Sequence, residues 1–368
     1  MNISTTRKEL QRAFSKLIKT TQARSQTPLI NYTYISSGAH GVLLHSTDLE
    51  VGIKTTITAS VNTNGEGLFP TTELNDIISV IDEGRVDIEI AGPHINIKSE
   101  NGTSFDIPTL SFQEYPKVPE NKHETVYNIN TSELKRILDA IIYAVNKDQL
   151  KPALSGALFS FSEEGLNFVS TDGHRLVVVA KKNESNIIED FIIPKKYLNM
   201  LSSFIQGQKE SSLIFSNNHV FINNDRDVLY SRLIDEKYPN YKAVIPQDNS
   251  YVLKLQKEDF LNSIKATSIA TNKNTNQISL NLALGEVFLK SVNQPESKTV
   301  YAPLKTAEYD GEKISIGFNA TYLKEAIMNY PSEEILFVFK DELSATLLLP
   351  KTKNHKITIL LMPVRINE

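Results

Sequence analysis

Ser170-Thr171-Asp172-Gly173-His174-Arg175-Leu176 is a polar turn between two apolar, strand-like runs at 166–169 and 177–180. Two hypotheses follow from these residues. In the first, the turn is an active-site loop in which Asp172 and His174 act as acid and base. In the second, it forms one wall of a docking pocket. The choice between them depends on what the rest of the chain repeats.

The composition is that of an ordinary globular chain. Of 368 residues, 40% are hydrophobic and 22% are charged, and this length favours two or three domains with cores of their own. The lack of cysteine excludes disulfides, a thiolate nucleophile and a Cys-built zinc site, and it suits a reducing compartment. The charged N-terminal segment and the lack of a long apolar run predict a cytoplasmic protein that is neither exported nor membrane-spanning.

The polar turn has a partial copy earlier in the chain. Ser46-Thr47-Asp48-Leu49-Glu50 precedes it by 124 residues, and both stretches follow a short apolar strand. Tyr115-Pro116 and Tyr238-Pro239 mark equivalent loops near the ends of two repeats. Matches that keep the same order along the chain indicate a repeated unit.

The starts of the predicted helices extend the repeat to a third copy. Phe69-Pro70-Thr71 and Ile193-Pro194-Lys195 are again 124 residues apart, and Phe318-Asn319-Ala320 follows 125 residues later. We therefore predict three copies of one unit. The expected domains are 1–125, 126–249 and 250–368.

Periodicity predicts the elements within each copy. In the first copy, apolar residues at helical spacing predict helices over 6–20 and 71–81. Alternating residues at 86–90 and 94–98 predict a hairpin with one buried face. The expected fold class is α+β, with two helices packed on antiparallel sheet in each of three repeated domains.

Basic residues gather on the predicted helices, whereas many acids lie on the strands. In the first helix Lys8, Arg12, Lys16 and Lys19 lie opposite the apolar stripe, and only Glu9 interrupts them. Further cations in or near predicted helices are Arg24, Lys135, Arg136, Lys147, Lys195, Lys196, Lys265 and Lys273. A chain of net charge −4 that collects cations on its helices can offer a positive surface to nucleic acid phosphates. Solvated helix faces are the alternative.

The repeat also decides between the two hypotheses for the turn. Asp48 and Asp172 occupy matching places, and a turn-forming Asp is needed wherever the turn recurs, whereas a catalytic acid is not. His174 and Arg175 have no counterpart in the first copy, where Leu49 and Glu50 stand instead. We therefore expect the second copy to use His174 and Arg175 for a purpose of its own.

Three stretches resemble one known family. Thr171-Asp172-Gly173-His174-Arg175-Leu176, Tyr238-Pro239-Asn240-Tyr241 and Leu361-Met362-Pro363-Val364-Arg365-Ile366 together are similar to the bacterial sliding clamps, the beta subunits of the replicative DNA polymerase. The resemblance follows the whole chain in order. It implies a head-to-tail homodimer that forms a closed ring, of which one chain is half, with helices lining the hole. It further implies a processivity factor with no catalytic activity, cofactor or metal.

The resemblance also implies partners and sites. The partners would be encircled duplex DNA, the replicative polymerase with its exonuclease complex, the clamp loader, and repair polymerases and ligase-type proteins that dock through short apolar peptides. The implied peptide pocket comprises Leu154, Thr171, Gly173, His174, Arg175, Leu176, Pro239, Val244, Tyr322, Leu343, Ala345, Leu360, Met362, Pro363, Val364 and Arg365. The expected DNA contacts are Arg12, Lys16, Arg24, Arg136, Lys195 and Lys196. The expected dimer interface includes Phe105, Ile107, Ile269 and Ala270.

The chain departs from the family pattern at three places. Ala243 stands where the family often has Arg, Thr71-Thr72 replaces an often basic helix start, and Asn367-Glu368 extend the usual C-terminus. Two competing hypotheses are a three-domain hydrolase or lyase that uses Asp172 and His174, and a monomeric peptide-binding scaffold without DNA.

Overall fold

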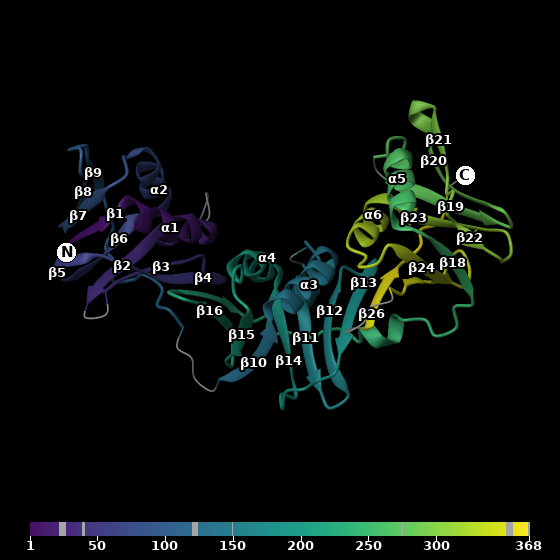
Figure 1. The fold of residues 1–368 in the computed structure, drawn as a ribbon, viewed down its shortest axis with the longest axis horizontal. Helices are drawn as coiled ribbons and strands as arrows, with labels where there is room; N and C mark the ends of the chain where they lie inside the picture. Colours follow the sequence, from purple (N-terminus) through teal and green to yellow (C-terminus); the bar gives the residue numbers. More distant parts are fainter. Residues whose placement is uncertain are drawn as a thin grey trace. The chain divides into compact units, whose positions relative to one another are not determined.

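The structure is a computed structural model that describes residues 1–21, 27–38, 41–119, 124–148, 150–273, 275–350 and 356–366. Arg24, Asn367 and Glu368 lie outside the described residues. The chain divides into two compact units (Figure 1). Unit 1 comprises Met1–Thr131 and Asn199–Leu233, and unit 2 comprises Ser132–Leu198 and Ile234–Glu368.

The first copy lies within unit 1. Its elements are β1 (Asn2–Thr6), α1 (Arg7–Leu17), β2 (Tyr32–Gly38), β3 (Gly41–Thr47), β4 (Val51–Ile57), β5 (Ser60–Thr63), β6 (Gly65–Pro70), α2 (Thr71–Val80), β7 (Arg85–Ala91), β8 (His94–Ser99) and β9 (Ser104–Pro108). The second and third copies repeat this order.

The second copy is shared between the two units, and the third lies within unit 2. The elements of the second are β10 (Thr125–Asn130), α3 (Thr131–Ile141), β11 (Gly156–Ser162), β12 (Gly165–Thr171), β13 (Arg175–Lys181), β14 (Glu189–Pro194), α4 (Lys195–Phe204), β15 (Glu210–Phe215), β16 (His219–Asn224) and β17 (Asp227–Arg232). Those of the third are β18 (Tyr251–Gln256), α5 (Lys257–Ser268), β19 (Gln277–Ala283), β20 (Glu286–Asn293), β21 (Lys298–Pro303), β22 (Glu308–Tyr309), β23 (Ile314–Asn319), α6 (Ala320–Met328), β24 (Glu334–Phe339), β25 (Thr346–Leu348) and β26 (Lys356–Leu361).

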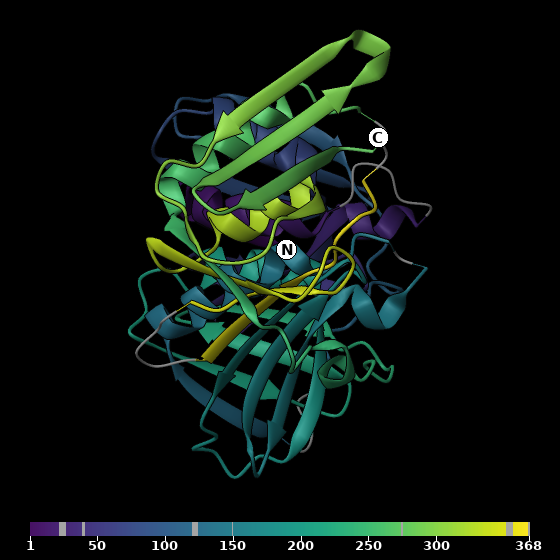
Figure 2. The same cartoon turned by 90° about the vertical axis from the view of Figure 1, so that its right-hand side faces the viewer.

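The order of helices and strands in the three copies confirms the predicted α+β repeat. In the described ranges each copy runs strand, helix, a set of strands, helix, and a last set of strands, with β5 and β22 as additions of the first and third copies. All the strand pairs between these elements are antiparallel. Figure 2 shows the β20–β21 hairpin of the third copy in light green.

Burial explains why these sequences form these elements. In α1 the stripe Leu10, Ala13, Phe14 and Leu17 is completely buried, and the helix packs against α2. The Thr6 side chain caps α1 by accepting the amide hydrogen of Glu9. In β8 exposed and buried residues alternate, as a strand with one buried face requires.

Strands from successive copies join into continuous sheets. In unit 1, β17 of the second copy pairs with β4 of the first, and we call this contact the first joint. In unit 2, β26 of the third copy pairs with β13 of the second, and we call this contact the second joint. Within the described residues, β9 and β21 end their sheets.

Among the residues that the structure describes, no helix is long and apolar enough to cross a bilayer.

Candidate functional site

The turn after β12 is built by its own side chains. Oδ1 of Asp172 accepts the amide hydrogens of His174 at 2.9 Å and Arg175 at 3.1 Å. The Thr171 hydroxyl donates to the Arg175 carbonyl at 2.6 Å and accepts the amide hydrogen of Gly173 at 3.1 Å. Gly173 has a φ of +90°, in the left-handed region that favours glycine. This hydrogen bonding confirms Asp172 as a turn-forming residue.

The turn after β3 has the same hydrogen bonds. Oδ1 of Asp48 accepts the amide hydrogens of Glu50 at 3.1 Å and Val51 at 2.8 Å. Leu49 takes the place of Gly173 with a φ of +77°. The two turns are therefore one structure used twice. The matching hydrogen bonds place Glu50 and Val51, rather than the expected Leu49 and Glu50, opposite His174 and Arg175.

Arg175 is a buried cation at the second joint. Its side chain is 5% exposed, and its guanidinium donates to Oδ2 of Asp172 at 3.0 Å, to Oε2 of Glu325 at 2.5 Å and to the Tyr143 carbonyl at 2.7 Å. The guanidinium also lies over the Tyr143 and Tyr322 rings, 5.1 and 4.6 Å from their centroids. Arg175 therefore holds the second and third copies together, because Asp172 and Glu325 belong to different copies.

His174 contacts Tyr322 of the third copy and the C-terminal segment. Its exposed ring stacks on Tyr322, with centroids 5.7 Å apart and an interplanar angle of 22°. Its carbonyl accepts the amide hydrogen of Met362 at 2.9 Å, and Val364 donates to the Gly317 carbonyl at 2.8 Å. The structure thus brings the two halves of the predicted pocket together, with Met362 41% exposed beside them.

Beneath the turn lies an apolar cluster that spans the second joint. Its buried members are Leu158, Val169, Leu176, Val178, Ile192, Tyr238, Leu347 and Leu360. Leu154, Tyr241, Ile245 and Ala345 pack against it. We call this cluster, the 171–175 turn, Tyr322 and Met362 the docking wall.

The docking wall contains many of the residues predicted for the pocket. Leu154, Leu176, Ala345 and Leu360 belong to the cluster or pack on it. The remaining predicted apolar residues stay accessible around it: Val244 and Leu343 are exposed, and Pro363 and Val364 are partly exposed. Pro239 and Arg365 are also exposed.

Sequence reasoning missed several residues of the wall. Tyr143 and Glu325 hold Arg175, and Tyr238, Tyr241 and Leu347 supply apolar surface. The Tyr238-Pro239 repeat was a signal for Tyr238. Nothing local marks Glu325, which lies 150 residues from Arg175 in the chain.

The acid–base hypothesis for the turn is not supported. Both carboxylate oxygens of Asp172 accept hydrogen bonds from the turn itself, and His174 stacks on Tyr322. Groups of His, Cys, Asp or Glu arranged to hold a metal ion do not occur in the part of the chain that the structure describes.

Two predicted DNA contacts, Arg12 and Lys16, share a buried carboxylate at the first joint. Asp227, whose side chain is 4% exposed, binds Lys16 and Thr55 through short contacts and Arg12 Nη1 at 3.2 Å. Burial acts to raise the pKa of Asp227, but the Lys16 and Thr55 hydrogen bonds and the Lys16 and Arg12 charges lower it below its usual value. Arg12 and Lys16 therefore tie α1 of the first copy to β17 of the second.

The other predicted DNA contacts differ in accessibility. Arg136 is exposed on α3. Lys195 is partly buried and donates to the Val145 carbonyl at 2.6 Å. Burial lowers the pKa of both Lys195 and Lys196.

The predicted dimer residues lie on β9 and just after α5. On β9 Ile107 is buried and Phe105 is partly exposed. Just after α5 Ile269 is 80% exposed, whereas Ala270 is buried. Ile269 is therefore the member of this set with most apolar surface to cover.

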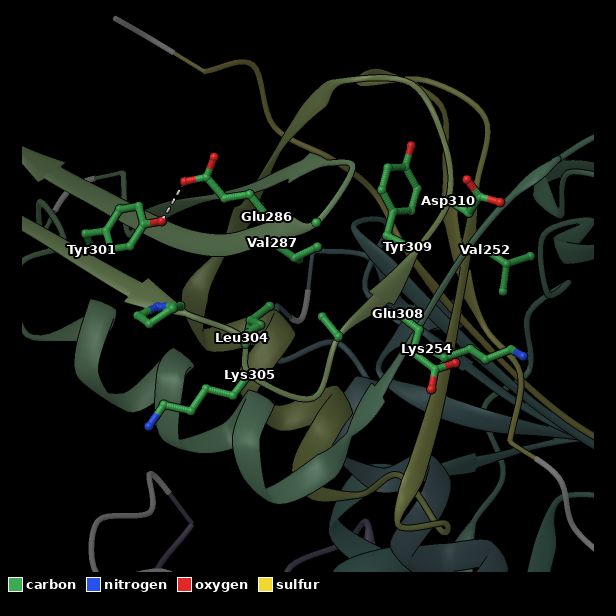
Figure 3. Close-up of a pocket in the computed structure, with 13 residues that line it drawn as sticks. Val252, Lys254, Glu286, Val287, Tyr301, Leu304, Lys305, Glu308, Tyr309 and Asp310 are labelled. Atoms are coloured by element: carbon green, nitrogen blue, oxygen red, sulfur yellow. Dashed lines mark hydrogen bonds between the residues drawn. The ribbon is translucent and has the colours of Figure 1, made fainter.

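A cleft of about 650 Å³ lies elsewhere in the third copy (Figure 3). Its lining mixes charges, with Lys254 and Glu308 from paired strands and a 3.0 Å hydrogen bond from the Tyr301 hydroxyl to Glu286. The predicted pocket residues do not line it. The cleft is separate from the docking wall and shows no convergent set of polar groups that defines a ligand.

Comparison with known proteins accounts for nearly the whole chain. The N-terminal, central and C-terminal domains of the DNA polymerase III beta subunit match residues 1–119, 128–240 and 242–365. The beta sliding clamp of Pseudomonas putida is 24% identical over 371 residues, with both chains fully covered. That of Bacillus subtilis is 23% identical over 380 residues, covering 99% of this chain and all of the relative.

Solved structures show the same fold. The DNA polymerase III beta subunit of Pseudomonas aeruginosa superposes with a TM-score of 0.92 at 23% identity, and the griselimycin-bound sliding clamp of Bartonella birtlesii with 0.92 at 24% identity. Each comparison covers 100% of both chains. The repeated fold, the shared turn and the matches to all three domains lead to one conclusion: the chain belongs to the DNA polymerase III beta subunit family, the sliding clamps of DNA replication.

Proposed function

We propose that this DNA sliding clamp works as a head-to-tail homodimer whose closed ring encircles duplex DNA and tethers the replicative polymerase. We further propose that the polymerase, the clamp loader and repair proteins dock short apolar peptides on the docking wall. Neither role requires catalysis, because a ring threaded on DNA is held by topology.

The proposal of a ring rests on the way in which strands of successive copies pair at the two joints. At each joint the last strand of one copy pairs with the same strand of the preceding copy: β17 with β4, and β26 with β13. Among the described residues, this rule leaves two strands without such a partner, β9 and β21. Strand β9 is the last strand of the first copy, and β21 is the strand of the third copy that corresponds to β4 and β13. Both end their sheets in the described part of the chain. Pairing of β9 with β21 of a second chain is heterologous, and such contacts either close into a ring or grow into a filament.

The exposed apolar surface supports the same interface. Ile269 follows α5, and Phe105 lies on β9 with part of its ring accessible. Burying such side chains between two chains stabilises the contact by about 1.5–3 kcal/mol for each large apolar residue.

We assign the DNA contacts to those lysine and arginine side chains on the helices that are exposed. Arg136 and its neighbour Lys135 are exposed on α3, as are Lys8 and Lys19 in the first copy and Lys265 on α5. Such cations attract phosphates without reading sequence, which permits sliding. Arg12 and Lys16 contribute less because Asp227 holds both side chains and offsets one of their two positive charges.

The docking wall suits an apolar peptide. It offers aliphatic surface from Leu176 and Leu360, adaptable Met362, and the stacked rings of His174 and Tyr322. The Bartonella birtlesii clamp was solved bound to griselimycin, and we propose the docking wall as the place where this chain would bind the same compound.

The ring is tested by topology. The protein is loaded on nicked circular DNA with a clamp loader and followed by gel filtration before and after the DNA is linearised. Retention on circles and loss from linear DNA is expected; equal loss from both would reject the ring. Ile269→Glu should reduce the mass measured by light scattering from dimer to monomer, whereas Leu284→Glu, an exposed control in the β19–β20 turn, should not.

The docking wall is tested separately by calorimetry with griselimycin. The double variant His174→Ala with Met362→Ala should lose about tenfold or more in affinity for griselimycin while light scattering still reports a dimer. Met328→Ala, which removes another exposed methionine of the third copy, is the matched control. Unchanged affinity in the double variant would place the binding site elsewhere.

A further inference from the structure

The backbone of β9 shows which of its residues face the open edge of its sheet. Ser99 donates its amide hydrogen to the Thr103 carbonyl at 2.9 Å, so the odd-numbered residues of β9 bond to β8. In an antiparallel pair, successive residues direct their backbone groups to alternate sides. The backbone groups of Ser104, Asp106 and Pro108 therefore point away from β8, toward the edge.

The same reasoning applies to β21. Leu304 donates its amide hydrogen to the Val287 carbonyl at 2.9 Å, so the even-numbered residues of β21 bond to β20. Thr299, Tyr301 and Pro303 therefore direct their backbone groups toward the edge of this sheet. Each strand offers a row of backbone groups to a further strand, and the proline of each row lacks the N–H.

The two joints within the chain use one register. Aligning the copies strand by strand equates Gly52 with Leu176 and Tyr230 with Leu360. Gly52 pairs with Tyr230 at the first joint, and Leu176 pairs with Leu360 at the second. The side chains differ, since the Tyr230 ring lies where a Cβ atom of Gly52 would be. The register is therefore a property of the repeat.

Strand β9 is aligned with β17 of the first joint by the strand that precedes each of them. Pro108 and Arg232 each pair with the histidine that begins the preceding strand. Counting back along both strands, Ser104 corresponds to Val228.

Strand β21 is aligned with β4 in the same way. Strands β3 and β20 begin at hairpin turns of the same length. The second residue of β3 pairs with Ile57, and the second residue of β20 accepts the amide hydrogen of Leu304. Counting back along both strands, Tyr301 corresponds to Lys54.

These alignments give a register for the contact between two chains. At the first joint Lys54 pairs with Val228. The corresponding contact sets Ser104 of one chain opposite Tyr301 of the other. Both residues direct their backbone groups outward, as a hydrogen-bonded pair requires, and a shift by one residue would bring outward groups against inward ones.

Two prolines separate this register from shifts by two residues. With Ser104 opposite Tyr301, Pro108 and Pro303 fall at opposite ends of the contact, beyond the paired strand residues. A shift that sets Ser104 opposite Pro303 brings both prolines into the contact, where each removes a backbone donor. The reverse shift sets Ser104 opposite Thr299 and leaves Tyr301 against the β8–β9 turn.

We propose that two chains join in this one register, with Ser104 of one chain opposite Tyr301 of the other, and that Pro108 and Pro303 end the contact. The inference rests on the proposed ring, for which it names the paired residues. The paired strands of the two joints contain no proline. Fewer backbone hydrogen bonds therefore join two chains than join two copies within a chain.

Disulfide cross-linking tests the register, because the chain contains no cysteine of its own. Ser104→Cys is combined in one chain with Tyr301→Cys, Thr299→Cys or Pro303→Cys, and covalent dimer is followed on non-reducing gels during mild oxidation. All four positions are exposed, so the variants should fold. Opposed residues lie within disulfide reach, whereas diagonal neighbours are about 7–8 Å apart. We expect the pair with Tyr301→Cys to cross-link about fivefold faster or more than the other two.

The outcomes separate the register from the ring. A dominant cross-link to position 299 or 303, or no cross-link in a protein that light scattering reports as a dimer, would overturn the register. A ladder of longer covalent products from the pair with Tyr301→Cys would support the register and reject ring closure. A monomeric wild type would reject the proposed ring and this contact with it.

The role of the prolines is tested by Pro303→Ala. This variant regains an N–H aimed at the Gly102 carbonyl of the second chain, so the dissociation constant of the dimer should fall about threefold or more. Pro295→Ala, exposed in the connection between β20 and β21, is the matched control and should leave the dissociation constant unchanged. An unchanged constant in Pro303→Ala would show that the proline does not end the contact.

Discussion

Nη1 of Arg175 on β13 lies 2.5 Å from Oε2 of Glu325 on α6, so an ion pair spans the second joint. Arg175 itself is buried and also binds Asp172 and the Tyr143 carbonyl. Arg175, one of the residues that distinguish this turn from its copy in the first domain, therefore supports the docking wall. Its neighbour His174 remains exposed at the surface, where the proposed ligand would bind.

Glu325→Ala should weaken ligand binding without removing a contact to the ligand. Loss of the carboxylate leaves a buried guanidinium with one acidic partner, which destabilises the second joint by about 1–2 kcal/mol because Glu325 is itself partly exposed. We expect griselimycin affinity to fall severalfold in calorimetry. Glu325→Asp should recover part of it, and Lys324→Ala, next along α6, should change nothing. Wild-type affinity in Glu325→Ala would show that the ion pair does not position the wall.

Asp227→Asn should reduce stability in a pH-dependent way. The folded-state pKa of Asp227 is lowered, so its contribution is fully present above the unfolded pKa of about 3.9 and is lost as the pH falls through the folded value. We expect the variant to lose about 2 kcal/mol in urea unfolding at neutral pH. The difference from the wild type should shrink below about pH 4. A constant difference across this range would argue against the ion cluster.

His45 should make the wild type less stable in mild acid. Burial lowers its pKa to about 4 from the usual value of 6.5, so the unfolded chain binds the proton first. Stability therefore falls as the pH decreases from about 6.5 to about 4, by roughly 3 kcal/mol in total. His45→Gln should lack this component when urea unfolding is compared at matched pH values. Parallel pH profiles for the two proteins would contradict a buried neutral His45.

Arg136→Ala and Lys16→Ala should separate free cations from neutralised ones. Affinity for a short duplex is measured by fluorescence anisotropy at increasing salt. Loss of a phosphate contact lowers the slope of log affinity against log salt by about 1, and we expect this for Arg136→Ala. Lys16→Ala should leave the slope unchanged, because Asp227 already holds that side chain. The opposite result would make Lys16 a DNA contact.

The repeat made much of the fold predictable from sequence. Asp48 and Asp172 form their turns through hydrogen bonds to residues two and three positions away, so local sequence was sufficient. The hairpin around Gly92-Pro93 also depends on short-range alternation. In each case the interacting residues are neighbours in the chain.

The remaining features depend on partners far apart in sequence. Lys16 looked like a free cation on a basic helix face, yet its carboxylate partner, Asp227, lies 211 residues away. Arg175 was expected at a ligand surface, and Glu325 instead holds it inside the second joint. Periodicity gives the face of a helix or strand, but which copy covers that face is decided by pairing across the joints.

The contact between Tyr230 and Gly52 also constrains how this sequence can change over generations. Any side chain acquired first at Gly52 collides with the ring, and a smaller residue acquired first at Tyr230 leaves a void over bare backbone. Neither step is tolerated alone as well as both together, so the pair is coupled in the sense that a double-mutant cycle measures. A tyrosine at position 230 in this orientation therefore requires glycine at position 52.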